Sequence, residues 1–181
     1  SAMAEGLAEA GTNTVVIGRR KEAGDVVVAS IRAKGHKALF VQADVLDEKD
    51  LLNAKETILK EFGSIDILVN AAGGNLPGAV IMPEQNFFDL KMEEFQKVVD
   101  LNLKGTVLPT KVFCDVMAKR KKGVIINIAS MASFRPITRV VGYSASKAAV
   151  DNFTQWLAVE MAKKFGEGIR VNAIAPGFFM P

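Results

Sequence analysis

Residues 130–147 read SMASFRPITRVVGYSASK, and they follow an apolar run, GVIINIA, at 123–129. Such a run is typical of a buried strand, which would bring Ser130 to its carboxyl end. A helix is predicted to begin near Tyr143, so that Tyr143 and Lys147 lie one turn apart on one face. A fixed ammonium favours ionisation of a neighbouring phenol. Tyr143 is therefore predicted to be a general acid or base, with Ser130 hydrogen-bonding the reacting oxygen.

Further landmarks follow the same order along the chain as in a known family. They are Asp66–Gly73, which reads DILVNAAG, then Asn102 in a predicted helix, and Ile169–Gly177, which reads IRVNAIAPG. Together with the Ser130, Tyr143 and Lys147 pattern, they resemble the short-chain dehydrogenase/reductase family. The resemblance covers nearly the whole chain, and it implies a Rossmann-like oxidoreductase that uses a nicotinamide cofactor.

The resemblance also implies roles for single residues. Asn102, Ser130, Tyr143 and Lys147 would be catalytic, and Lys147 would also bind the nicotinamide ribose. Asn102 would hold a water that links Lys147 to solvent. The alternative for Asn102 is a polar residue that satisfies backbone groups at a helix bend, and the alternative for Tyr143 and Lys147 is a pair of surface helix residues.

Candidate cofactor-binding residues lie near the ends of predicted strands. Arg19 and Arg20 follow a strand, and a guanidinium can pair with a 2′-phosphate, which favours NADP while NAD remains possible. Solvated arginines are the alternative, and Asp44 could equally be a strand-end cap. Small residues after Asn70 let a dinucleotide approach the backbone, although a tight turn would also need them. The full set is Arg19, Arg20, Asp44, Val45, Asn70, Ala71, Ala72, Gly73, Tyr143, Lys147, Pro176 and Gly177.

Within the family, several segments are similar to the D-mannonate oxidoreductase (fructuronate reductase) subgroup. These segments are residues 83–90, 105–110, 152–159 and 175–179. A sugar-acid substrate is predicted, and its carboxylate would need a cation, which Arg135 or Arg139 could supply unless both are solvated loop charges. The predicted substrate-binding residues are Ser130, Arg135, Arg139 and Tyr143. The alternatives are polyols, gluconate or acyl thioesters as substrates, a nucleotide-sugar epimerase or dehydratase, and an inactive cofactor-binding relative.

Composition excludes several other classes of protein. The chain has 181 residues, 49% hydrophobic and 24% charged, which suits one globular domain with a large core. The net charge of +3 is spread out apart from Lys119–Lys122, a run expected at a helix end, so nucleic-acid binding is not predicted. One Cys and one His exclude an internal disulfide and a metal cluster. Without an apolar run of membrane-spanning length, we predict a cytoplasmic protein with no membrane contact.

Short apolar strands alternate with helices and glycine-marked turns along the whole chain. This order predicts an α/β fold of one domain, residues 1–181, with a doubly wound parallel sheet. No GxxxGxG turn occurs, and the family pattern would place that turn and its strand before Ser1, with a final strand after Pro181. We therefore expect a partial domain that binds a dinucleotide poorly by itself.

Two long helices are predicted to carry more apolar surface than one core can use. The first spans about Glu93 to Lys119 and should bend, or free a backbone group, at Pro109. The second is the Tyr143 helix, which contains Phe153, Trp156 and Leu157. The resemblance implies a homodimer through these helices, often doubled to a homotetramer, whereas the alternative is that missing residues cover them.

Overall fold

The computed structural model describes residues 1–135 and 137–178. Pro136 and residues 179–181 lie outside the described residues, and with them Phe179 of the segment 175–179. The chain divides into two compact units, Ser1–Ile65 and Asp66–Pro181, and each contains helices packed on parallel strands. The α/β fold class is thus confirmed, while the prediction of a single domain stays a prediction.

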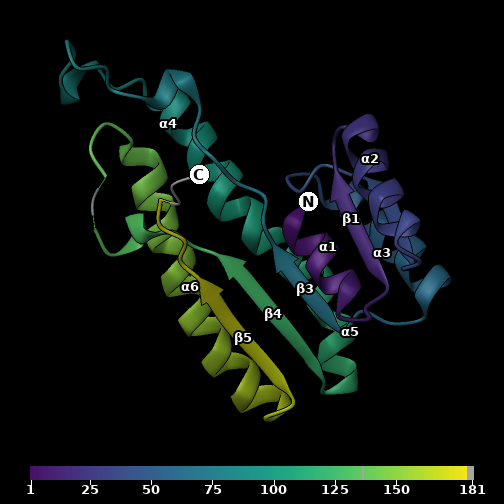
Figure 1. Ribbon diagram of the computed structural model, residues 1–181. Coiled ribbons are helices and arrows are strands. Elements are labelled where there is room, and N and C mark those ends of the chain that lie inside the picture. Colours follow the sequence, from purple (N-terminus) through teal and green to yellow (C-terminus); the bar gives the residue numbers. More distant parts are fainter. Residues whose placement is uncertain (136, 179–181) are drawn as a thin grey trace. The chain divides into compact units, whose positions relative to one another are not determined.

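The first unit is built around a pair of parallel strands (Figure 1). Its elements are α1 (Ala2–Glu9), β1 (Thr14–Gly18), α2 (Lys21–Ala33), β2 (Ala38–Gln42) and α3 (Glu48–Phe62). Thr14 pairs with Ala38 at one end of the ladder and Gly18 with Gln42 at the other. The residues that follow β1 and β2 therefore emerge at the same edge of the sheet.

Close packing of a helix on a strand holds the first unit together. Position 24 in α2 is a glycine, and a Cβ there would lie 2.0 Å from the Phe40 ring of β2. Only glycine allows this approach, which brings the buried Val28 and Ile31 into the core beside Ala38. Helix α3 is capped at its start, where the Asp47 side chain accepts a hydrogen bond from the Asp50 N–H.

The second unit contains a three-stranded parallel sheet in the order β3-β4-β5 (Figure 1). Its strands are β3 (Ile67–Asn70), β4 (Gly123–Ile128) and β5 (Ile169–Ile174), and its α-helices are α4 (Met92–Val99), α5 (Gly105–Arg120) and α6 (Val141–Phe165). Three short 3-10 turns, at Pro77–Ala79, Phe87–Asp89 and Met131–Ser133, occur in the connections. Helices α5 and α6 pack against this sheet.

The predicted helix from Glu93 to Lys119 is interrupted, but not where the sequence suggested. A π-helical turn at Asp100–Lys104 separates α4 from α5, and α5 continues through the buried Pro109. Pro109 has no N–H to donate to the Gly105 carbonyl. The π-helical turn therefore ends directly before the residue whose carbonyl lacks the usual α-helical donor four residues later. Pro109 therefore lies inside α5 and is not the site of the irregularity.

The apolar run 123–129 forms strand β4 as far as Ile128, as predicted. The ladder between β3 and β4 begins at the Ile67–Val124 pair. The Tyr143 helix begins two residues earlier than predicted, at Val141.

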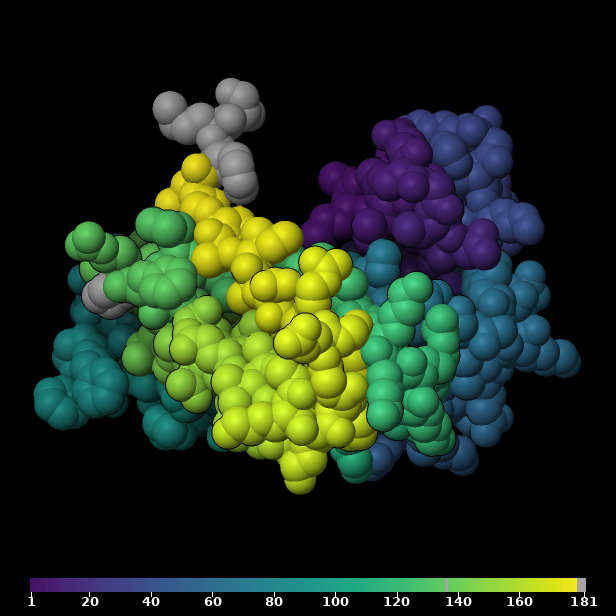
Figure 2. Space-filling view, turned by 90° about the horizontal axis from the view of Figure 1, so that it is seen from below, coloured from purple at the N-terminus to yellow at the C-terminus, as the bar shows by residue number. Residues whose placement is uncertain are grey.

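Helix α6 and strand β5 pack together and share one face of the second unit, where their yellow-green and yellow atoms adjoin (Figure 2). On α6, Leu157 is buried, whereas Trp156 is 58% exposed and its ring stacks on Phe153. Phe113 of α5 is buried in the core. Among the described residues, no helix is both long enough and apolar enough to span a membrane.

Candidate functional site

Ser130 is held just beyond the carboxyl end of β4. The strand's pairing with β5 continues past its last residue, because the Ala129 N–H donates to the Ile174 carbonyl at 2.8 Å. Ser130 then caps the 3-10 turn at Met131–Ser133, and its Oγ accepts a hydrogen bond from the Ala132 N–H at 3.1 Å. The side chain is buried, and this hydrogen bond holds it in place.

Lys147 reaches the same strand end from α6. The residue is only 4% exposed, and its Nζ donates to the carbonyl oxygen of Ile128, the last residue of β4, at 2.6 Å. Burial lowers the pKa of the Lys147 ammonium, because the charged form loses hydration. The ammonium is thus anchored two residues before Ser130.

Tyr143 lies beside that ammonium, as the four-residue spacing predicted. The Lys147 Nζ lies 5.7 Å from the centroid of the Tyr143 ring, within the range of a cation–π contact. The two side chains therefore share one environment and are not separate surface residues. Because Lys147 is bonded to β4, Tyr143 is also held near the carboxyl ends of the strands.

Asn102 occupies the π-helical turn and is completely buried. Its Nδ2 donates to the carbonyl oxygens of Gly74 at 2.7 Å and Val98 at 2.9 Å, and its Oδ1 accepts from the Gly74 N–H at 3.0 Å. The side chain thus satisfies backbone groups at an irregular turn, which was the alternative interpretation of this residue. Its predicted role in holding a water stays a prediction.

Gly73 marks the point at which Asn102 and Lys147 come together. Its φ of +155° favours glycine, and a Cβ there would lie 2.6 Å from Asn102 Oδ1 and 3.2 Å from Lys147 Nζ. The two side chains, from η3 (the π-helical turn, Asp100–Lys104) and from α6, thus meet at the backbone after β3. The glycine of the NAAG segment is required here by close approach as well as by conformation.

The remaining predicted residues of this segment differ from one another in environment. Asn70 is buried, and its Nδ2 bonds Thr110 and Asn127, so its side chain belongs to the interior. Ala71 is exposed and Ala72 is half-buried.

The turn after β5 lies against the Ser130 turn. The carbonyl oxygen of Pro176 accepts a hydrogen bond from the Met131 N–H at 2.9 Å. A Cβ at Gly177 would lie 3.3 Å from Met131 Cγ, so this glycine also permits a close approach. The structure thereby brings Pro176 and Gly177 to the neighbourhood of Ser130.

The two candidate substrate arginines have different surroundings. Arg139 has a left-handed φ of +73°, its Nε donates to the Ile81 carbonyl at 3.1 Å, and the Ile81 N–H donates to the Arg139 carbonyl at 2.9 Å. Its Nη2 also lies 3.4 Å from the Met82 sulfur. Arg135 is exposed, and its backbone N–H bonds the Met131 carbonyl. Arg139 therefore joins the loop before Tyr143 to the segment around Ile81.

That segment has a small pocket of its own, with a volume of about 170 Å³. Its lining residues are Pro77, Gly78, Val80, Ile81, Met82, Gln85, Asp89, Leu90 and Lys91. None of these is a predicted site residue.

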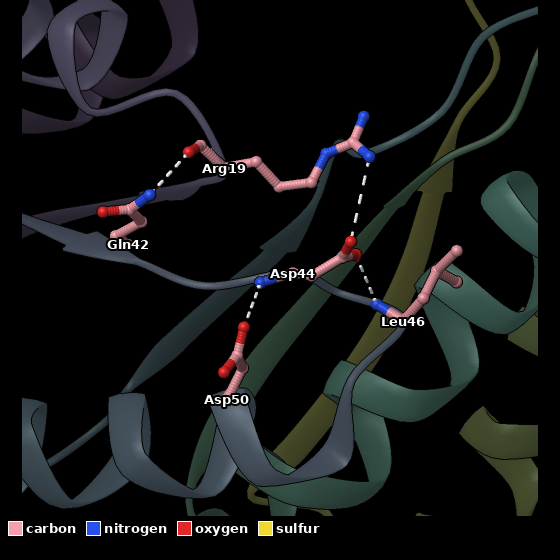
Figure 3. Close-up of polar contacts among 5 residues, drawn as sticks. All are labelled: Arg19, Gln42, Asp44, Leu46 and Asp50. Carbon is pink, nitrogen blue, oxygen red and sulfur yellow. Dashed lines mark hydrogen bonds and ion pairs between the residues drawn. The ribbon is translucent and has the colours of Figure 1, made fainter.

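In the first unit, Arg19 and Asp44 come from the adjoining ends of β1 and β2 (Figure 3). Arg19 Nη1 lies 3.8 Å from Asp44 Oδ2, and the Gln42 side chain donates to the Arg19 carbonyl at 2.9 Å. Asp44 Oδ1 accepts from the Leu46 N–H, and the Asp44 N–H donates to Asp50. The Arg19 side chain is 72% exposed, so the ion pair is weak and the guanidinium is accessible.

Sequence reasoning missed a set of buried polar residues behind the catalytic candidates. Asn127 lies inside β4, is fully buried, and its side chain bonds Asn70 and Thr154. The signal was present in the apolar run 123–129, where Asn127 is the only polar side chain. A buried amide in a strand must have hydrogen-bond partners, so Asn127 predicts that other polar side chains are buried beside it.

The comparisons with known proteins agree with this geometry. The model of the short chain dehydrogenase family matches residues 1–180, and the chain belongs to that family. It is 44% identical to an uncharacterized oxidoreductase, UxuB, of Bacillus subtilis, over 99% of this chain and 66% of that relative. The chain thus spans slightly less than two thirds of the length of this relative.

Two solved structures show the fold and the cofactors of relatives. A candidate D-mannonate oxidoreductase from Haemophilus influenza, with bound NAD, aligns with a TM-score of 0.92 at 39% identity, over 99% of this chain and 67% of that one. An actinorhodin polyketide ketoreductase variant with NADPH aligns with a TM-score of 0.87 at 30% identity, over 97% of this chain and 64% of that one. Relatives therefore bind either nicotinamide dinucleotide.

Proposed function

We propose that the protein is an NAD(P)-dependent oxidoreductase that interconverts a carbonyl and a secondary alcohol, with Tyr143 as its acid and base. The observation that carries this proposal is the Lys147 ammonium, buried, bonded to Ile128 and 5.7 Å from the Tyr143 ring. Beside this fixed cation, Tyr143 would donate its hydroxyl proton to a carbonyl oxygen in reduction and accept a proton from an alcohol in oxidation. Ser130, fixed at the neighbouring strand end, would orient that oxygen.

The residues present in the second unit fit a nicotinamide cofactor. Gly73 has no side chain at the point where Asn102 and Lys147 meet, which leaves the backbone open to a ligand. Lys147 has three N–H donors, and Ile128 takes one of them, so others can bind ribose hydroxyls. When bound, the cofactor supplies or accepts the hydride. Ala71, Ala72, Pro176 and Gly177 are proposed to contact it as well.

In the first unit, we propose that Arg19 and Arg20 bind the 2′-phosphate of NADP, and that Asp44 and Val45 contact the adenine. The exposure of the Arg19 guanidinium supports the first assignment, because it can form a bidentate pair with a phosphate. Turnover of the full-length protein with NADH and with NADPH tests it. A clear preference for NADH would overturn the NADP assignment.

For the substrate, we propose a sugar acid of the mannonate and fructuronate type. The similarity to the Haemophilus structure supports this class. Arg135 is the better candidate for the substrate carboxylate, because the Arg139 Nε already bonds Ile81. Arg135→Gln should raise KM for sugar acids, and Arg139→Gln is its comparison.

One assay of the full-length protein tests these proposals together. It measures oxidation of NADH and NADPH with fructuronate, and reduction of NAD and NADP with D-mannonate, gluconate, neutral polyols and a hydroxyacyl thioester. Turnover with fructuronate and D-mannonate is expected. Turnover restricted to polyols or thioesters would overturn the sugar-acid assignment. No turnover with any substrate would favour an inactive cofactor-binding relative.

We also propose that the protein is a homodimer or homotetramer. The exposed Trp156, stacked on Phe153, and the exposed Val159 form an apolar surface on α6 that supports this proposal. Sedimentation of the full-length protein at micromolar concentration tests it, and a monomer would overturn it. Trp156→Glu should weaken the association.

A further inference from the structure

A continuous set of buried side-chain hydrogen bonds crosses the second unit behind Lys147 and Asn102. Its members are polar, and none is more than 5% exposed. They are Asn70, Thr106, Thr110, Asn127 and Thr154. Buried polar groups are costly unless they are paired, and paired networks fix the elements that carry them. The network therefore restricts how the helices and strands of this unit lie relative to one another.

Two asparagines form the centre of the network. Asn70 and Asn127 are register partners in the β3–β4 ladder, and Asn70 Nδ2 donates to Asn127 Oδ1 at 2.8 Å. The other hydrogen of Asn70 Nδ2 is donated to Thr110 Oγ1 at 2.8 Å. Asn127 Nδ2 donates in turn to Thr154 Oγ1 at 2.9 Å. Asn127 thus accepts from one neighbour and donates to another, which a carboxylate or an apolar side chain cannot do.

Among the described residues, two side-chain hydrogen bonds attach α6 to β4, and the network forms one of them. Thr154 Oγ1 accepts from Asn127 and donates to the Val150 carbonyl, and it lies two helical turns after Lys147. The second attachment is the bond from Lys147 Nζ to Ile128, the residue next to Asn127. Two bonds to adjacent strand residues fix both the rotation and the position of α6 along β4.

Towards α5, the network reaches the π-helical turn. Thr110 Oγ1 donates to the Thr106 carbonyl at 2.7 Å, and Thr106 Oγ1 donates to the Asn102 carbonyl at 2.8 Å. Asn102 then bonds both backbone groups of Gly74. Both ends of the segment 70–74 are thus attached to the helical residues 102–110. Asn70 bonds Thr110 at one end, and Gly74 bonds Asn102 at the other.

We propose that Asn127 is a positioning residue, which sets the place of Tyr143 and Lys147 on α6 relative to Asn102 at the π-helical turn. Lys147 is fixed within α6, and Asn102 is fixed at the π-helical turn before α5. Their meeting at Gly73 depends on how α6 and α5 are placed against β4 and β3. The Asn127 side chain bonds Thr154 of α6 and Asn70 of β3, and Asn70 in turn bonds Thr110 of α5. This proposal rests on the proposed oxidoreductase function, because the position of Tyr143 and Lys147 affects a reaction rate only if these residues are catalytic.

The test compares Thr154→Val with Thr154→Ser in the full-length protein. Valine has the shape of threonine without its hydroxyl, so it leaves the Asn127 N–H without its partner, whereas serine keeps the hydroxyl. We expect Thr154→Val to lower kcat with fructuronate and NADPH about 10- to 100-fold, since small misplacements of reacting groups cost rates of this order. KM should change little, and Thr154→Ser should retain activity. Asn127→Leu should lower kcat at least as much.

A matched control separates positioning from stability. Thr14→Val removes a buried threonine hydroxyl of β1 that bonds Thr12 at 2.9 Å. It should lower the melting temperature but leave kcat unchanged. If Thr154→Val behaves like Thr14→Val, or if Thr154→Ser loses as much activity as Thr154→Val, the network is structural only and the proposal fails. Failure of Thr154→Val to fold would also overturn it, because a positioning contact must be separable from folding.

Amide hydrogen exchange gives a readout that does not depend on turnover. The Gly74 N–H is held by Asn102 Oδ1, so its exchange reports on the π-helical turn. We expect Asn127→Leu to speed exchange at Gly74 several-fold and Thr14→Val to leave it unchanged. If the parent protein shows no turnover with any substrate of the assay described above, the proposed oxidoreductase function fails. If Gly74 exchange is unaffected by Asn127→Leu, the positioning proposal fails instead.

Discussion

A cation that is proposed to bind a ligand lies at the end of β4, and another lies at the end of β1, but the two are held differently. At the end of β4, Lys147 is almost wholly buried and bonded to the backbone of the strand. At the end of β1, the Arg19 side chain is 72% exposed and its partner Asp44 lies 3.8 Å away. The first cation is fixed in place, whereas the second can move at little cost.

This difference follows from what each cation is proposed to do. A residue that tunes a reacting group must hold a fixed distance to it, and burial with backbone bonds achieves this. A residue that contacts the far end of a cofactor needs only charge and reach. Substitutions near β4 should therefore change rates strongly, while those near β1 should change cofactor preference modestly.

The largest effect is expected from Tyr143→Phe. Loss of the hydroxyl removes the proposed acid and base, and such groups contribute about 10²- to 10⁴-fold to rate. Steady-state turnover of the full-length protein should fall by that factor, while cofactor affinity measured by fluorescence titration stays close to that of the parent. Activity within a few-fold of the parent would show that the proton moves elsewhere.

Gly73→Ala should have the next largest effect. A methyl group at this position overlaps Asn102 Oδ1 at 2.6 Å, in a backbone conformation that alanine rarely adopts. Strain of this kind costs about 1–3 kcal/mol of unfolding free energy, and the displaced Asn102 and Lys147 should lower turnover as well. Urea denaturation and kinetics together measure the two losses.

Gly74→Ala is the matched control for that substitution. Gly74 has a similar φ of +149°, but nothing lies within 4 Å of a Cβ built there. It should carry the backbone strain without the overlap. Equal effects of the two substitutions on turnover would mean that the contact at Gly73 has no functional weight.

The fold class and the placement of Tyr143 beside Lys147 could be predicted from sequence because both depend on local patterns. Apolar strands bounded by glycine turns predict a parallel sheet, and a spacing of four places Tyr143 and Lys147 on one helix face. The structure brings these two residues to the carbonyl of Ile128, directly before Ser130, as the strand–turn–helix order implied.

The rest depends on contacts between segments distant in the chain. The π-helical turn forms where Asn102 bonds Gly74, and no local signal near Asn102 specifies that partner. Pro109, the residue with a local signal, proved to lie inside a continuous helix. In the same way, Arg139 bonds Ile81, 58 residues away, and nothing in its own loop predicts this.

A smaller effect is expected in the pH dependence of stability. Because burial lowers the pKa of Lys147, the unfolded chain binds a proton more tightly than the folded one. This group therefore opposes folding below its folded pKa, and stability rises with pH from there to the unfolded value. Lys147→Met should reduce this rise as the pH approaches 10.5, the ordinary pKa of a lysine, as measured by urea denaturation.

Lys163→Met, an exposed position on the same helix, is the comparison for that experiment. It should keep the pH dependence of the parent protein. If Lys147→Met also keeps it, the lowered pKa assigned to Lys147 is wrong. An absolute loss of stability in Lys147→Met is expected in either case, because the Ile128 carbonyl loses its donor.

The smallest effect is expected at the exposed pair in the first unit. Asp44→Asn removes the charge that faces Arg19, and an exposed pair of this kind contributes at most about 1 kcal/mol, so stability should hardly change. The freed guanidinium should favour a 2′-phosphate, which raises the ratio of NADPH to NADH turnover by a few-fold. Arg19→Gln should lower the same ratio by about 10-fold, the equivalent of one charged hydrogen bond. If both variants keep the parent ratio of NADPH to NADH turnover, Arg19 does not select the cofactor and is a solvated arginine at the end of β1.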